Sequence, residues 1–66
     1  MNNLSNLRKA HGLKQEELAA LIGVSKQAYS NYERGEREAG YGILNALANH
    51  FNTSVDFLLD RTDVIL

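Results

Sequence analysis

Apolar residues recur at intervals of three and four positions along almost the whole chain, which is the spacing of one face of an α-helix. The pattern falls into five stretches, and no proline interrupts any of them. The apolar positions, stretch by stretch, are Leu4, Leu7 and Ala10; Leu18, Leu21 and Ile22; Ala28, Tyr29 and Tyr32; Leu44, Leu47, Ala48 and Phe51; and Val55, Leu58 and Leu59. Helices this short are not stable alone in water, so the sequence predicts an all-α fold of five helices around one core.

The residues between these stretches indicate where the helices begin and end. The second helix is predicted to begin near Gln15, and Gly35 follows the third, where glycine commonly ends a helix. The fourth helix is predicted to end near Asn52. Either Thr53 or Ser54 can then cap the fifth helix through its hydroxyl group.

Only three residues, Gly23, Val24 and Ser25, separate the second helix from the third. So short a connection favours a sharp crossing of the two helices over a parallel hairpin, and this is the helix-turn-helix arrangement. Gly23 tolerates the positive φ that such a turn requires, and Ser25 is a good N-cap for the third helix. Ala19 provides a small side chain where the helices meet, and Tyr29 is expected to anchor the third helix to the core.

The polar face of the third helix is unusual for a surface that serves only solubility. Gln27, Ser30, Asn31 and Arg34 stand at i, i+3, i+4 and i+7 and therefore share one face. A solvated face more often carries paired glutamate and lysine, whereas serine and asparagine lower helix propensity. Amides, a hydroxyl and a cation on one exposed face are typical of a surface that recognises a polar partner.

The segment LKQEELAALIGVSKQAYSNYERG, residues 13–35, resembles the helix-turn-helix of the Cro and phage-repressor (XRE-type) family of bacterial and phage transcriptional regulators. The similarity continues through residues 44–59. It implies a five-helix, lambda-repressor-like DNA-binding domain that occupies residues 1–66 as a single unit. The helix-turn-helix would span residues 15–34, and residues 61–66 would form a short C-terminal tail.

In that family the third helix enters the major groove, and the resemblance assigns base reading to Lys26, Gln27 and Asn31, with Ser30 beside them. Gln and Asn amides can donate and accept together, as an adenine edge requires, and Lys26 can donate to guanine O6 or N7. Gln15 matches a family position that binds phosphate.

Further cations and one ion pair complete the implied site. Lys14, Arg34 and Arg37 would hold the protein on phosphates without reading sequence. The family also pairs an arginine of its first helix with a glutamate near the end of the recognition helix, and Arg8 and Glu33 occupy those positions.

Each assignment has a simpler alternative. Lys26 and Arg34 can be ordinary solvated helix charges, and the Ser30 hydroxyl can bond back to its own helix. Arg8 and Glu33 can be surface charges, although a partly buried pair would explain a cation within the apolar stripe of the first helix.

Two departures from the family pattern affect the helix starts. Lys14 stands where the family often has a Thr or Asn N-cap, so the second helix is expected to begin less firmly. Residues 39–42 lack the common Pro-Ser-x-Glu pattern, which removes a cap from the fourth helix.

Composition narrows the class of function. The chain has 66 residues, a net charge of −1 and a pI near 6.0, which argues against nucleic acid unless the cations gather on one edge. It has no cysteine, and His11 and His50 lack the ligand spacing of a metal site. We identify neither a catalytic constellation nor a cofactor motif, and therefore expect no enzyme. No apolar run approaches a membrane span, so we expect a cytoplasmic protein.

The resemblance implies a sequence-specific regulator of transcription, and specifically a repressor that binds double-stranded DNA. One such helix reads few base pairs, so a homodimer on a palindromic operator is expected. The predicted dimer contact is the fifth helix and the tail, which ends in the apolar residues Val64, Ile65 and Leu66. The alternative for the tail is that it folds back on its own domain or is disordered. The alternative is a protein-interaction module, such as an antitoxin-like or antirepressor component, which the acidic pI permits.

Overall fold

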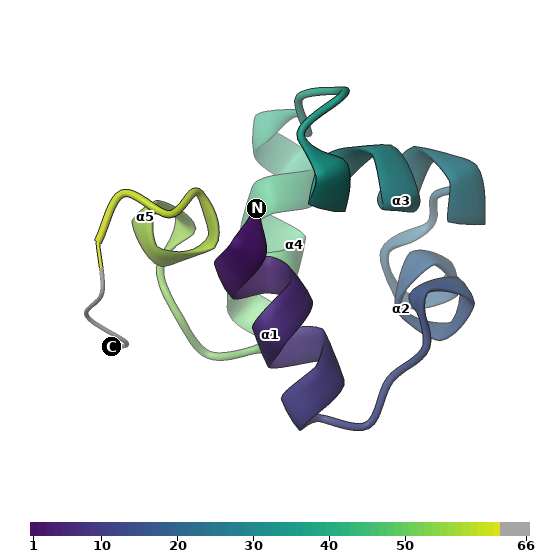
Figure 1. The fold of residues 1–66 in the computed structure, drawn as a ribbon, viewed down its shortest axis with the longest axis horizontal. Coiled ribbons are helices and arrows are strands. Elements are labelled where there is room, and N and C mark those ends of the chain that lie inside the picture. The colour runs from purple at the N-terminus through teal and green to yellow at the C-terminus, as the bar shows by residue number, and fades with distance from the viewer. Residues whose placement is uncertain (63–66) are drawn as a thin grey trace.

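The computed structural model describes residues 1–62 and contains five α-helices in that range (Figure 1). In chain order the helices are α1 (Asn2–Ala10), α2 (Gln15–Ile22), α3 (Lys26–Arg34), α4 (Tyr41–His50) and α5 (Val55–Leu58). The prediction of an all-α fold with five short helices is confirmed. The predicted dimer contact in the tail lies outside the described residues.

The helix ends follow the capping residues closely. Ser25 Oγ accepts a hydrogen bond of 3.1 Å from the Ala28 N–H at the start of α3. Of the two residues that could cap α5, the structure uses Ser54, whose Oγ accepts from the Phe57 N–H at 3.1 Å. The N-cap of α4 is Gly40, which has no side chain to cap the helix, as the residue types there lead one to expect.

The start of α2 is better supported than its N-cap residue predicts. Lys14 has no side-chain acceptor for the first N–H groups of the helix. However, Glu17 Oε1 accepts a hydrogen bond of 2.8 Å from the backbone N–H of Lys14. This contact closes one half of a capping box, and it places a negative charge in the first turn of α2, where the helix dipole favours it.

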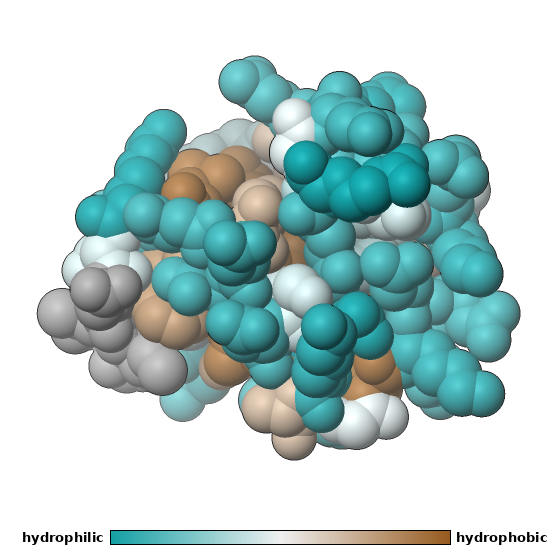
Figure 2. Space-filling model, in the orientation of Figure 1, coloured by the Kyte–Doolittle hydropathy of each residue, from teal (hydrophilic) through white to brown (hydrophobic). Residues whose placement is uncertain are grey.

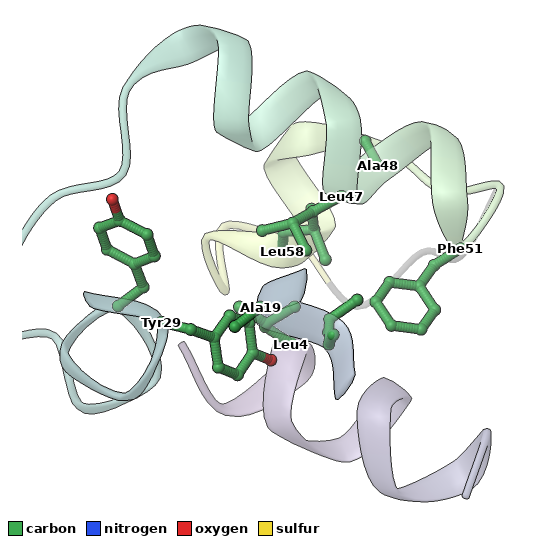
Figure 3. Packing of buried hydrophobic residues seen from close by; sticks show 9 residues of the cluster. Leu4, Ala19, Tyr29, Leu47, Ala48, Phe51 and Leu58 are labelled. Atoms are coloured by element: carbon green, nitrogen blue, oxygen red, sulfur yellow. The ribbon is translucent and has the colours of Figure 1, made fainter. Parts of the chain in front are cut away.

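The core lies where the five helices converge (Figure 3). Tyr29 of α3 and Leu47 of α4 are fully buried in it. The other buried members of this cluster are Leu4, Leu18, Ala19, Tyr32, Ala48, Phe51 and Leu58. Because every helix contributes to this cluster, the orientation of α3 is set by the whole domain. No helix within residues 1–62 is long and apolar enough to cross a membrane.

Asp60, just after α5, caps the N-terminus of α1. Its Oδ2 accepts from the Asn2 N–H at 2.9 Å, and its Oδ1 accepts from the Asn3 N–H at 2.8 Å. Burial raises the pKa of Asp60, but these two hydrogen bonds and the nearby positive N-terminus lower it more, so the pKa lies below its ordinary value. The carboxylate thereby joins the end of the fold to its beginning.

We expect the Asp60→Asn variant to unfold with about 1 kcal/mol less free energy than the wild type at pH 7, because it removes the charge from this cap. The folded pKa is lowered, so the contribution is present above the unfolded pKa of the carboxyl and is lost as pH falls through the folded value. The measurement is urea unfolding at pH 7 and at pH 3. Asp56→Asn, which alters an exposed pair with Arg61 at 3.7 Å, is the control. An equal loss in both variants, or a loss independent of pH, would contradict the assignment.

Candidate nucleic-acid interface

The sharp crossing of α2 and α3 is visible in Figure 1, where α2 is seen along its axis while α3 is seen from the side. Gly23 has φ of 76°, a left-handed conformation that ends α2 without strain. The Val24 N–H then donates to the Ala19 carbonyl at 3.0 Å, which closes the turn. Ala19 itself is only 2% exposed, so a small residue lies at the crossing, as predicted.

The predicted base-reading residues all lie on the side of α3 that faces away from the core. Lys26 and Gln27 are exposed, and Ser30 and Asn31 are partly exposed. Figure 2 shows a largely hydrophilic surface over α2 and α3, whereas apolar surface appears on the side of α5 and along the lower edge. The structure therefore brings these four side chains onto one polar face, next to one another.

Three cations flank this face. Lys14, Arg34 and Arg37 are all exposed, and they come from the start of α2, the end of α3 and the loop that follows α3. Arg34 also forms an ion pair with Glu36, at 3.2 Å between Nη2 and Oε2. Gln15 at the start of α2 contacts Glu33 near the end of α3, so the three segments that carry these cations lie toward the C-terminal end of α3. One of the cations, Arg34, already has an acidic neighbour.

A row of hydrogen bonds runs along the exposed face of α3. The Gln27 Nε2 group donates to Asn31 Oδ1 at 3.1 Å, and Arg34 Nη2 donates to the same oxygen at 2.7 Å. Both contacts join residues that are three or four positions apart, which face each other on a helix. The amide of Asn31 is consequently held from both sides before any partner is bound.

Beneath the polar face, the carboxylate of Glu33 gathers donors from all three N-terminal helices. Arg8 Nε of α1 donates to Glu33 Oε2 at 2.7 Å, and Gln15 Nε2 of α2 donates to Oε1 at 3.0 Å. The Tyr29 hydroxyl, one turn earlier on α3, donates to Oε2 as well. The side chains of Arg8 and Glu33 are only 12% and 7% exposed. This cluster fixes α3 against α1 and α2.

The surroundings keep both members of the ion pair charged. Burial raises the pKa of Glu33, but the hydrogen bonds from Arg8, Tyr29 and Gln15 outweigh it, so the net pKa lies below its ordinary value. The hydrogen bond to Glu33 raises the pKa of Arg8. Burial, together with the hydrogen bond to the carboxylate, raises the pKa of Tyr29, so its hydroxyl remains a donor.

Gln15 has two roles in this arrangement, one in the Glu33 cluster and one assigned by the resemblance. The resemblance assigns it to phosphate, yet one N–H of its amide already donates to Glu33. A carboxamide has two N–H groups, so Gln15 can donate the second one outward. The carboxylate thus orients the side chain from behind.

Sequence reasoning missed several contacts of these networks. Tyr29 was expected only as an anchor in the core, and the i,i+4 spacing of Tyr29 and Glu33 was the signal that could have revealed its hydroxyl as a donor. The hydrogen bond from Arg34 to Asn31 was also not foreseen, although these residues are three positions apart. Within residues 1–62 the structure contains no group of three or more His, Asp or Glu side chains that could hold a metal ion.

Comparison with known proteins places this geometry in context. The family profile described as helix-turn-helix matches residues 4–58. The chain is 42% identical over 60 residues to the uncharacterized HTH-type transcriptional regulator YobD of Bacillus subtilis, covering 91% of this chain and 54% of the relative. It is 36% identical over 61 residues to the HTH-type transcriptional regulator AnsR of the same organism, covering 92% and 53%.

A third relative carries a different name. The chain is 35% identical over 52 residues to the antitoxin PezA of Streptococcus pneumoniae, covering 79% of this chain and 33% of the relative. The chain therefore spans about half the length of the two regulators and a third of the antitoxin.

Proposed function

We propose a sequence-specific DNA-binding function for this chain, because the chain belongs to the XRE-type helix-turn-helix family of transcriptional regulators. The observation that carries the proposal is the polar face of α3, with Lys26, Gln27, Ser30 and Asn31 turned away from the core. In the proposed complex α3 lies in the major groove of double-stranded DNA, and these four side chains read base edges.

The chemistry of the face suits this role. Gln27 offers both a donor and an acceptor to an adenine edge, and Lys26 offers a donor to guanine O6 or N7. Lys14, Arg34 and Arg37 hold the register through phosphates, and Gln15 adds a neutral donor. No cofactor or metal takes part in the proposed binding.

We expect the Gln27→Ala variant to lose about 1–3 kcal/mol of binding free energy on its preferred site and much less on random DNA. The reason is that the amide contributes only where a matching base edge faces it. The preferred site is first selected from random duplexes, and both affinities are then measured by fluorescence anisotropy at one salt concentration. Lys14→Ala is the matched control, since a phosphate contact should affect both DNAs equally. An equal loss on both DNAs for Gln27→Ala would refute its role as a reader.

We further propose that two copies act together on a palindromic operator. A two-fold dimer would place its α3 helices about 34–36 Å apart, in successive major grooves on one side of the duplex. The proposed contact is α5 and the tail with its apolar residues Val64, Ile65 and Leu66. Sedimentation equilibrium of the full chain and of a chain ending at Thr62 tests this. Monomers in both cases, without cooperative binding to a palindrome, would refute the dimer.

The proposed outcome of binding is repression, because the bound protein occupies a promoter. The proposed location is the cytoplasm, where the duplex is accessible.

A second candidate function is a protein-interaction module of the antitoxin type. It is favoured by the similarity to the antitoxin PezA and by the net charge of −1. Retention on random duplex DNA at low salt, lost as salt rises, supports the first function, whereas no retention supports the second.

A further inference from the structure

We propose that Arg34 acts as a positioning residue that decides which base edge Asn31 recognises. Arg34 was assigned above to phosphate contact, which carries no sequence information. Its Nη2 group, however, donates to Asn31 Oδ1 at 2.7 Å, on the exposed face between the two residues. The inference rests on the proposed DNA-binding function and concerns how that function discriminates between bases.

The direction of this contact follows from the chemistry of arginine. A guanidinium group has five N–H donors and no acceptor, so only the oxygen of a carboxamide can face it favourably. Rotating the Asn31 amide by 180° would set its NH₂ group against the cation of Arg34. Arg34 therefore fixes the orientation of the Asn31 side-chain amide.

The orientation of the Asn31 amide in turn determines the orientation of the Gln27 amide. Two amides one helical turn apart can bond in either sense, because each has a donor and an acceptor. Because Asn31 presents its Oδ1 oxygen on this side, Gln27 can only act as the donor. The observed hydrogen bond, from Gln27 Nε2 to Asn31 Oδ1 at 3.1 Å, has this direction. Asn31 Oδ1 then has two donors, from Gln27 and Arg34, which match its two lone pairs.

This row determines what each amide offers to DNA. Asn31 retains only its NH₂ donor, so it matches an edge that presents acceptors, such as guanine N7 and O6. It does not match adenine, whose N6 amino group would need the occupied oxygen. Gln27 retains its Oε1 acceptor and its second N–H, which is the pair that an adenine edge requires. Under this proposal only Gln27 keeps the donor and acceptor pair that adenine requires.

Glu36 has a place in this arrangement. An acidic side chain near the DNA face repels phosphates, but the Glu36 carboxylate pairs at 3.2 Å with the same Arg34 Nη2 nitrogen that donates to Asn31. Both side chains are about half exposed or more in the free protein. Docking in the groove excludes water from the row and strengthens its hydrogen bonds.

The test compares the wild type with three arginine variants on matched duplexes, after a fourth variant has located the relevant base pair. The Asn31→Ala variant first identifies the base pair of the selected site at which discrimination is lost. Affinities are then measured on four duplexes that differ only at this base pair, for the wild type, Arg34→Met, Arg34→Lys and Arg37→Met. Arg34→Met removes the donor, Arg34→Lys keeps a donor and the charge, and Arg37→Met removes a nearby cation outside the row.

We expect the wild type to prefer guanine over adenine by about tenfold at this base pair, and Arg34→Met to reduce the ratio to near one. Arg34→Lys should keep most of the preference, and Arg37→Met should keep it fully while binding all four duplexes more weakly. If Arg34→Met weakens all four duplexes equally and keeps the ratio, the inference is wrong while the DNA-binding proposal stands. If the wild type selects no sequence at all, the DNA-binding proposal fails and the inference fails with it.

Discussion

Replacing Glu33 by alanine is expected to lower the free energy of unfolding by about 3–5 kcal/mol. The substitution leaves the guanidinium of Arg8 buried without its carboxylate and also removes the acceptor of Tyr29 and Gln15. A domain of this size has a total stability of roughly 3–10 kcal/mol, so the expected loss is a large part of the total. The measurement is urea unfolding followed by circular dichroism.

Two controls separate the buried pair from ordinary surface charge. Glu36→Ala removes a carboxylate from the exposed pair with Arg34, and its effect should stay within about 1 kcal/mol. The double variant Arg8→Met with Glu33→Leu replaces the pair by apolar side chains, and it should regain much of the stability that Glu33→Ala loses. An equal loss of unfolding free energy in the Glu33→Ala and Glu36→Ala variants would show that the buried cluster contributes no more than a surface contact.

If the three cations proposed to contact phosphate do so, raising the salt concentration from about 50 to 200 mM is expected to weaken DNA binding about 40-fold for one copy of the chain, because each contact would release a counterion. For two copies bound together the same change should weaken binding about 2,000-fold. The three cations are Lys14, Arg34 and Arg37, all of which are exposed. The measurement is a titration of one selected duplex at several salt concentrations.

The slope of this titration tests the number of phosphate contacts directly. Removing the charge of Arg37 should reduce the slope of log affinity against log salt by about one unit per copy. Gln15→Ala removes a neutral donor and should weaken binding without changing the slope, which makes it the matched control. Binding that is insensitive to salt would point to a partner other than DNA.

Much of the fold could be predicted because it depends on local signals. The spacing of residues such as Leu44, Leu47 and Phe51 determines which side of a helix is buried, whatever its neighbours are. The turn at Gly23 and the cap at Ser25 act within four residues, so short-range chemistry was sufficient there. The pairing of Arg8 with Glu33 came instead from the family resemblance, since no local rule joins residues 25 positions apart.

What sequence reasoning missed depends on the packed structure. Asp60 reaches α1 only because α5 folds back beside it, and nothing near Asp60 in the sequence indicates that partner. The role of Gln15 as a donor to Glu33 likewise needs α2 and α3 to cross at the observed angle. The direction of the amides along α3 was hidden for another reason, because both orientations satisfy the helix until Arg34 selects one.

The division of labour along α3 has a consequence for redesign. Tyr29 and Tyr32 belong to the core cluster and Glu33 to the buried ion pair, whereas Lys26, Gln27, Ser30 and Asn31 do not belong to the core cluster. The residues that stabilise the helix and those proposed to read DNA are therefore separate sets, interleaved along the same nine residues. Substituting Lys26, Gln27, Ser30 and Asn31 by grafting should therefore change the proposed DNA preference without changing the melting temperature of the domain.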